Sequence, residues 1–345
     1  MHRRTFLTTS MAAAGALSLP ARVQALSQDS LIRPKVLRPG DRVALINPST
    51  TIHDPAAAIR AEAVVRALGL TPVTPPSLLT RPRDLAGSVR HRLDELHGAF
   101  ADPSVSAVFA ARGGYGISEI IAEIDYDLIG RNPKVFLGFS DLTPLHLAIQ
   151  RRTRLVTFHG RMPSLTRFPP FSLAALRRAF CTVEPLGTLR NPDEPDPLRP
   201  VYPLRTISPG TASGRLIGGN LTMLMTTLGT PWEIDTRGTI LFFEEVDEAP
   251  YAVARMLRAL KHGGKFDDVA GVVVGACANC DEPSSATPYT LNEIFDQVLG
   301  DLGVPVFSGL VLGHTAEQLT VPLGTQASMD ASACMLTILE SGVTA

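Results

Sequence analysis

Short apolar runs alternate with segments of helical periodicity through the first half of the chain. Runs at 43–46, 105–110, 135–137 and 155–158 are rich in Val, Leu, Ile and Phe and predict buried strands. Apolar residues at helical spacing predict helices over 55–67, 88–100, 117–124 and 142–150. Because strands that alternate with helices pair in parallel, we expect a wound α/β sheet in this half.

The second half begins after a break in this pattern. Residues 185–209 are dominated by Pro and Arg and show almost no periodicity, which predicts a linker. Apolar runs at 215–217, 239–243 and 271–275 then alternate with helical patterns, and short apolar runs from 304 onward indicate β-structure. We therefore expect an N-terminal α/β domain over 35–184 and a C-terminal domain over 210–341.

The N-terminus has the features of an export signal. Arg3 and Arg4 precede a mild apolar run, Met11 to Leu19, and Val23-Gln24-Ala25 resembles a cleavage site. The run is too short to span a membrane, and no Cys follows it to carry a lipid anchor. We expect residues 1–25 to be a twin-arginine signal peptide and the mature protein to be periplasmic.

Composition excludes several classes of partner. The formal net charge of the 345-residue chain is −1, which argues against nucleic acid or an anionic membrane surface. Trp232 is the only Trp, so a sugar-stacking groove is not indicated. Cys277 and Cys280 form a single C-x-x-C without a second pair, and no HExxH motif occurs. We expect no metal and no cofactor, and we interpret both thiols as core residues, although an exported protein leaves a disulfide open.

Two glycine-bearing turns follow neighbouring predicted strands: the first turn is residues 111–116 and the second turn is residues 137–141. Parallel pairing of the strands would bring both turns to one sheet edge. In the second turn, Ser140 stands at a strand-to-helix corner, where its hydroxyl and the N–H of Asp141 would face a substrate. Leu142 occupies the place of the second Gly of a G-x-S-x-G elbow, and the alternative is that Ser140 caps the next helix. The first turn offers the backbone N–H groups of Gly113 and Gly114.

A serine nucleophile needs a base and an acid that orients the base. His314 and His159 both stand at strand ends, and Glu244 and Glu245 follow the run at 240–243. A solvated acidic loop is the alternative for the two glutamates. Arg112 in the first turn would bind a carboxylate through two hydrogen bonds, with a surface ion pair as the alternative.

The motifs together resemble the serine L,D-carboxypeptidase family, also called the muramoyl-tetrapeptide carboxypeptidases or peptidase family S66. They occur in the family's order over about residues 35–340. The matching segments are Val43–Ser49, Arg92–His97, Ala111–Gly116, Gly138–Asp141, His159–Gly160, Ile217–Thr222, Ile240–Glu245 and Gly313–His314. Singly each motif is weak, whereas the ordered set is specific.

The resemblance implies a catalytic triad and a substrate. It implies Ser140 as nucleophile, His314 as general base and acid, and Glu244 as the residue that orients the histidine. The remaining implied site residues are Gly114 and Asp141 for the oxyanion hole and Arg112, Gly113 and Tyr115 for substrate binding. The implied reaction removes the terminal D-Ala from a murein tetrapeptide or related muropeptide, without a metal.

The resemblance also implies an architecture and leaves alternatives. It implies a wound, mostly parallel N-terminal sheet domain, a C-terminal α+β domain with barrel-like β-structure, and a homodimer. Glu245 stands where the family often has Asp, and Arg161 follows His159-Gly160 where Pro is commoner. The alternatives are a microcin C-type self-immunity peptidase that acts on aminoacyl-nucleotide peptides and a non-catalytic envelope protein that binds muropeptides.

Overall fold

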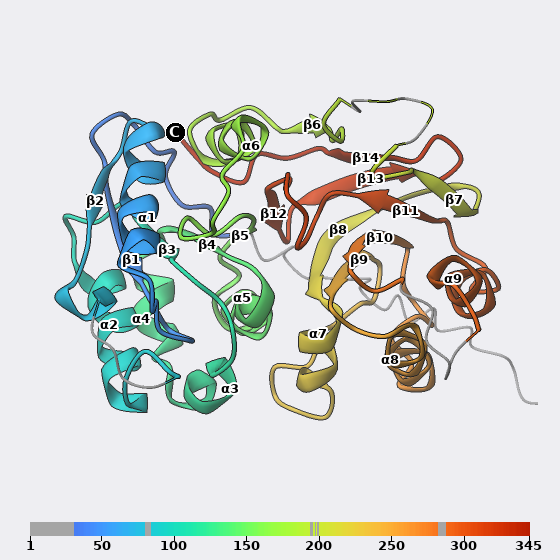
Figure 1. The fold of residues 1–345 in the computed structure, drawn as a ribbon, viewed down its shortest axis with the longest axis horizontal. Helices are drawn as coiled ribbons and strands as arrows, with labels where there is room; N and C mark the ends of the chain where they lie inside the picture. Colours follow the sequence, from blue (N-terminus) through green and yellow to red (C-terminus); the bar gives the residue numbers. More distant parts are fainter. Residues whose placement is uncertain (1–30, 80–83, 194–195, 197, 199, 282–287) are drawn as a thin grey trace, which may run out of the picture. The chain divides into compact units, whose positions relative to one another are not determined.

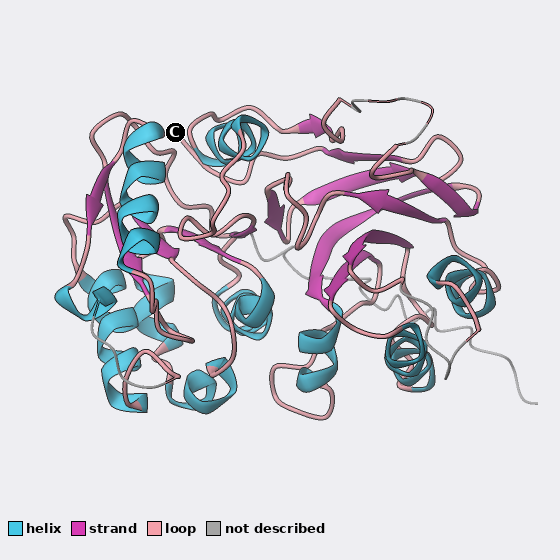
Figure 2. Cartoon of the chain, in the orientation of Figure 1, coloured by secondary structure: helices cyan, strands magenta, loops and turns pink. Residues whose placement is uncertain are grey.

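The computed structural model describes residues 31–79, 84–193, 196, 198, 200–281 and 288–345. The predicted signal peptide, residues 1–25, lies outside the described residues. Leu31–Ala345 is one compact unit. Within it, two β-sheets are each accompanied by helices, as Figures 1 and 2 show.

The first sheet has the order β12-β5-β4-β3-β1-β2. Its five N-terminal strands pair in parallel, and β12 from the second half of the chain pairs antiparallel with β5. The strands are β1 (Arg42–Ile46), β2 (Thr71–Val73), β3 (Ala107–Ala110), β4 (Val135–Gly138), β5 (Thr157–His159) and β12 (Val321–Leu323). The predicted wound, mostly parallel sheet is therefore confirmed, with an added antiparallel edge strand.

Helices cover both faces of this sheet because its strands are apolar on both sides. Val43 and Leu45 of β1 face one hydrophobic cluster together with α1 and α6, and Ala44 and Ile46 face a second with α2 to α5. The helices are α1 (Pro55–Ala67), α2 (Val89–Ala101), α3 (Ile117–Ile120), α4 (Tyr126–Arg131), α5 (Thr143–Thr153) and α6 (Pro170–Phe180), with 3₁₀ turns η1 (Pro76–Leu79), η2 (Ile121–Glu123) and η3 (Ser140–Leu142). The expected helix at 117–124 is thus split into α3 and η2.

The second sheet has the order β6-β14-β13-β8-β9-β10-β11-β7 and is open, with β6 and β7 as its edges in the described part of the chain. Its central strands β8 to β11 are parallel. The strands are β6 (Gly187–Thr188), β7 (Arg205–Ser208), β8 (Thr211–Asn220), β9 (Thr239–Val246), β10 (Gly271–Ala278), β11 (Val306–Leu310), β13 (Gln326–Asp330) and β14 (Met335–Ile338). Both edge strands come from the segment 185–209 that the sequence predicts as a linker.

Three helices, α7 (Leu221–Thr227), α8 (Pro250–His262) and α9 (Leu291–Leu299), lie on one side of β8 to β11 in Figure 1. Their apolar residues share one cluster with Leu241 and Phe243 of β9. In the described segments, none of the helices is both long and apolar enough to cross a membrane.

Candidate active site

Ser140 lies where β4 ends and the 3₁₀ turn η3 begins. Its backbone has a φ of 62°, in the left-handed region that non-glycine residues rarely adopt. The first residue before α5 is Leu142, and no side chain caps this helix. The capping alternative for Ser140 is therefore wrong, and its hydroxyl is available for another partner.

The partner of that hydroxyl is His314, which follows β11. His314 Nε2 lies 3.0 Å from Ser140 Oγ, and His314 Nδ1 lies 2.7 Å from Glu244 Oε2. Glu244 is fully buried near the carboxyl end of β9. With the Nδ1 proton held by the carboxylate, the neutral imidazole presents Nε2 as an acceptor for the serine proton. The structure thus places the three predicted side chains in the arrangement of a catalytic triad.

Glu245 has a different role because successive strand residues point to opposite faces. Its carboxylate accepts hydrogen bonds from Asn220 Nδ2 at 2.8 Å and from the backbone N–H and hydroxyl of Thr222 at 2.8 and 2.7 Å. It therefore fixes the start of α7. Of the two glutamates, Glu244 is the one that contacts His314.

The environment of His314 favours its protonated form. Burial disfavours the imidazolium, but the hydrogen bond to Glu244 and the charges of Glu244, Glu245 and Asp247 outweigh it and raise the pKa of His314. Glu244 Oε1 is buried without a hydrogen-bond partner among the described residues, and Oε2 is bonded to the backbone N–H and to Nδ1 of His314.

Gly313 allows Glu244 to approach the histidine backbone. A Cβ at this position would lie 1.9 Å from Glu244 Oε2. His159, the other strand-end histidine, is fully buried and binds the carbonyl of Leu312 through Nε2 at 2.6 Å. Burial lowers the pKa of His159. His159 therefore supports the segment before His314 and does not replace it as the base.

The first glycine turn lies against Ser140 and is held from two sides. A Cβ on Gly113 would meet Ser140 Cβ at 3.4 Å, and the hydroxyl of Thr50 donates to the Gly113 carbonyl. Gly114 has a φ of 119° and leaves no room for a side chain beside Thr50. The buried Arg92 donates to the carbonyl of Gly116 at 2.8 Å. These contacts hold the turn in place where it faces Ser140.

The other residues of the predicted site surround this turn. Asp141 is buried and accepts hydrogen bonds from the Ser49 hydroxyl at 2.5 Å and from Ile117 N–H at 3.1 Å. Neither Asp141 N–H nor Gly114 N–H donates to any residue that the structure describes. The side chains of Arg112 and Tyr115 are exposed.

Two cavities flank the segment His314–Ala316. One, of about 550 Å³, includes Tyr202, Asn279 and Asn292 in its wall, and the other, of about 310 Å³, includes Phe139 and Arg161. Sequence reasoning noted Arg161 only as a departure from the commoner Pro at the pocket rim, and it assigned no role to Thr50. The only signal for Arg161 was its position directly after His159-Gly160.

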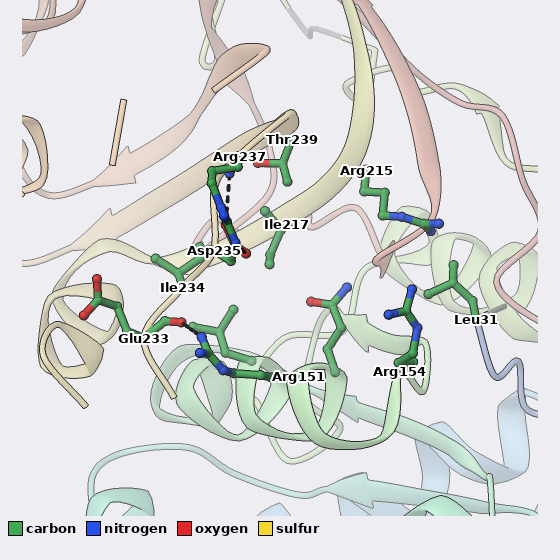
Figure 3. A pocket seen from close by; sticks show the side chains of 12 residues that line it. Leu31, Arg151, Arg154, Arg215, Ile217, Glu233, Ile234, Asp235, Arg237 and Thr239 are labelled. Atoms are coloured by element: carbon green, nitrogen blue, oxygen red, sulfur yellow. Dashed lines mark hydrogen bonds and ion pairs between the residues drawn. The ribbon is translucent and has the colours of Figure 1, made fainter. Parts of the chain in front are cut away.

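A further cavity of about 440 Å³ lies away from the triad, between α5, β8 and the start of β9 (Figure 3). Arg237 contacts Asp235 there at 2.6 Å, and Arg151 donates to the Glu233 carbonyl at 2.9 Å. None of the triad residues lines this cavity, so its charged groups are separate from the site.

The described residues contain no cluster of three or more His, Cys, Asp or Glu side chains suited to a metal ion. Cys277 and Cys280 are free thiols, and burial raises the pKa of both. A raised pKa keeps a thiol in its unreactive protonated form.

Comparison with known proteins shows the family. The model of the LD-carboxypeptidase N-terminal domain matches residues 43–160, and that of the LD-carboxypeptidase C-terminal domain matches residues 213–329. The chain belongs to the LD-carboxypeptidase family. The matched ranges contain Ser140 in the first and Glu244 and His314 in the second, so each family domain supplies part of the site.

The relatives of this LD-carboxypeptidase include murein peptide carboxypeptidases and a microcin C7 self-immunity protein. A probable murein peptide carboxypeptidase of Bacillus subtilis is 39% identical over 315 residues, which cover 90% of this chain and 95% of the relative. A solved muramoyltetrapeptide carboxypeptidase from Oxalobacter formigenes superposes with a TM-score of 0.74 at 26% identity over 86% of this chain and 97% of that one. The microcin C7 self-immunity protein MccF, solved with aspartyl sulfamoyl adenosine, superposes with a TM-score of 0.80 at 25% identity over 91% of this chain and 100% of that one.

Proposed function

We propose that this LD-carboxypeptidase hydrolyses the bond between the diamino acid and the terminal D-Ala of a murein tetrapeptide, with Ser140 as nucleophile. The observation that carries the proposal is the continuous hydrogen-bonded series from Ser140 through His314 to Glu244. The names of the murein peptide relatives support the substrate class.

The proposed mechanism begins with the neutral His314, which takes the Ser140 proton as the hydroxyl attacks the amide carbonyl. Glu244 stabilises the imidazolium that forms. The backbone N–H groups of Gly114 and Asp141, which have no acceptor among the described residues, stabilise the oxyanion, each contributing about 3 kcal/mol of barrier reduction. His314 then protonates the amine of D-Ala as it leaves, and water hydrolyses the acyl-enzyme by the reverse sequence.

The test is release of D-Ala from purified murein tetrapeptide by the wild type and by Ser140→Ala. We expect the substitution to reduce kcat by at least about 10³-fold, because the oxyanion donors and the binding surface alone provide only residual catalysis. Ser104→Ala, an exposed hydroxyl bonded to Asp102, is the matched control and leaves the rate unchanged. Release of D-Ala by Ser140→Ala at the wild-type rate would exclude a serine mechanism at this residue.

Microcin C-type self-immunity activity is the second candidate because the fold superposes on MccF. A nucleotide product favours aromatic side chains on which a base stacks. Trp232, the only Trp of the chain, packs against the apolar cluster beneath the first sheet. Aspartyl sulfamoyl adenosine and murein tetrapeptide in parallel assays separate the two activities, and we expect the higher kcat/KM for the tetrapeptide.

The proposal includes export and assembly. We place the mature enzyme in the periplasm on the basis of Arg3-Arg4 and the apolar run that follows, and we propose a homodimer on the basis of the family. Cell fractionation with Arg3→Lys/Arg4→Lys as control tests the export route, and light scattering of the mature protein tests the dimer.

A further inference from the structure

Arg161 is a buried cation on the segment that follows β5. The residue is 6% exposed, and its guanidinium donates to backbone carbonyls of two different loops. Nη1 donates to Thr315 O at 2.9 Å. Nε donates to Arg167 O at 2.9 Å, and Nη2 donates to the same carbonyl oxygen. The guanidinium thus connects its own loop to the residue after His314.

The charge of Arg161 has no carboxylate partner. Among the described residues, no Asp or Glu oxygen lies within ion-pair distance of it, although Glu317 and Tyr202 act on it from farther away. Burial accordingly lowers the pKa of Arg161. Besides its carbonyl acceptors the guanidinium lies over the ring of Phe168, 5.8 Å from the ring centroid, and a buried cation with no anion beside it remains costly. Of its five N–H groups, the three bonds leave one N–H on each terminal nitrogen for a further acceptor.

The cavity of about 310 Å³ lies next to this cation and to the triad. Phe139, which precedes the nucleophile, and His314 both line it, together with Arg161 and the exposed Arg167. A substrate residue bound in this cavity would lie on the side of His314 that faces Phe139. Its amine, which leaves when the peptide bond breaks, would then be near the histidine. The cavity has room for one small residue with a carboxylate.

We propose that this cavity binds the free C-terminal carboxylate of the substrate's leaving residue and that Arg161 is the cation that recognises it. The inference rests on the proposed function and specifies its leaving-group subsite. A guanidinium with one N–H on each terminal nitrogen matches a carboxylate with two oxygens. Arg112, which the sequence predicts to bind a carboxylate, has an exposed side chain, and an exposed ion pair discriminates little.

The test removes the charge from each side of the contact. Hydrolysis of a tetrapeptide ending in D-Ala is compared with that of the same peptide ending in D-alaninamide, by mass spectrometry of the released tripeptide. For the wild type we expect kcat/KM to favour the free acid by about 10- to 100-fold, the effect of a hydrogen bond to a charged group. For Arg161→Gln we expect this ratio to fall close to one, mainly through a higher KM for the acid.

Three matched variants locate the effect. Arg161→Lys keeps a charge in the cavity, and we expect it to retain part of the preference for the acid. Arg112→Gln removes the exposed cation of the first glycine turn, and Arg131→Gln removes an exposed cation of α4 that lines none of the cavities described above; we expect both to retain the wild-type ratio. Because acid and amide are measured in the same variant, a partial folding defect lowers both rates and leaves the ratio unchanged.

Several outcomes would overturn the inference. They are a wild type that hydrolyses acid and amide equally, an Arg161→Gln variant with the wild-type ratio, or loss of the ratio in Arg112→Gln instead. If no Arg161 variant folds, inhibition of the wild type by N-acetyl-D-alanine and by its amide is compared, and equal inhibition overturns the subsite. Absence of Ser140-dependent D-Ala release contradicts the proposed function itself, whereas Ser140-dependent release with an unchanged ratio contradicts only the role of Arg161.

Discussion

Replacing Glu244 by Gln tests the part of the site that most depends on tertiary structure. The substitution keeps the size of the side chain but removes the negative charge 2.7 Å from His314 Nδ1. Gln also offers an N–H to Nδ1, which favours the tautomer that carries its proton on Nε2. In that tautomer His314 no longer accepts the Ser140 proton.

The magnitude follows from the geometry. Two unit charges separated by 2.7 Å attract by about 6 kcal/mol at an effective dielectric constant of about 20. Solvent reaches the His314 side chain, which is 19% exposed, and weakens this attraction. We therefore expect the imidazolium of the transition state to lose about 3 to 5 kcal/mol, or roughly 10²- to 10⁴-fold in kcat.

The pH profile gives a second readout. His314 acts as a base only when neutral, so kcat/KM falls as pH decreases through its pKa, which lies above the ordinary value of 6.5. Without Glu244 the burial of the imidazole dominates and lowers this pKa. The acidic limb of the profile should consequently move to lower pH in Glu244→Gln.

Glu245→Gln is the matched control because Glu245 is the next residue on β9 and is also buried. Its hydrogen bonds go to Asn220 and Thr222, so we expect reduced thermal stability, a kcat within about tenfold of wild type and a smaller shift of the acidic limb. Steady-state kinetics of D-Ala release between pH 5 and 9, with thermal melts, measure all three quantities. Equal kinetic losses in the two variants would refute the assignment of Glu244 as the partner of His314.

Two further substitutions test the supports of the site. Gly313→Ala places a Cβ 1.9 Å from Glu244 Oε2, so kcat should fall at least about tenfold. The control is Gly98→Ala in α2, where no atom lies within 4 Å of the added Cβ, and it should raise the free energy of unfolding by up to about 1 kcal/mol. Similar kinetics for the two variants would contradict the close approach of Glu244 to Gly313. Arg92→Met removes the buried donor to Gly116 O and the ion-pair partner of Glu119, and we expect it to lower the free energy of unfolding in urea by about 3 kcal/mol. Arg90→Gln breaks the exposed ion pair with Asp94 and should lower it by less than about 1 kcal/mol. Equal losses in the two variants would show that Arg92 does not hold the turn.

Local pattern was sufficient for the first sheet because its strands are buried on both faces. Val135–Leu137 reads as a continuous apolar run, and the structure extends it by one residue to the strand Val135–Gly138. The helix α6 and the strand β7 were not predicted. The strand β7 has four half-buried residues at an edge of the second sheet, and its pairing with β11 is set by contacts across about 100 residues.

From the sequence by itself we predicted the family, the order of the motifs and, through the family resemblance, Ser140 and His314 as the candidate nucleophile and base. These are properties of local pattern, since a glycine turn after an apolar run has the same form wherever the strand is placed. Tertiary structure decided which glutamate contacts His314, because strand alternation sends Glu244 and Glu245 to opposite faces and only packing selects one. It also brought Arg161 beside Thr315, 154 residues later in the chain, and a contact of that range has no signature in either segment alone.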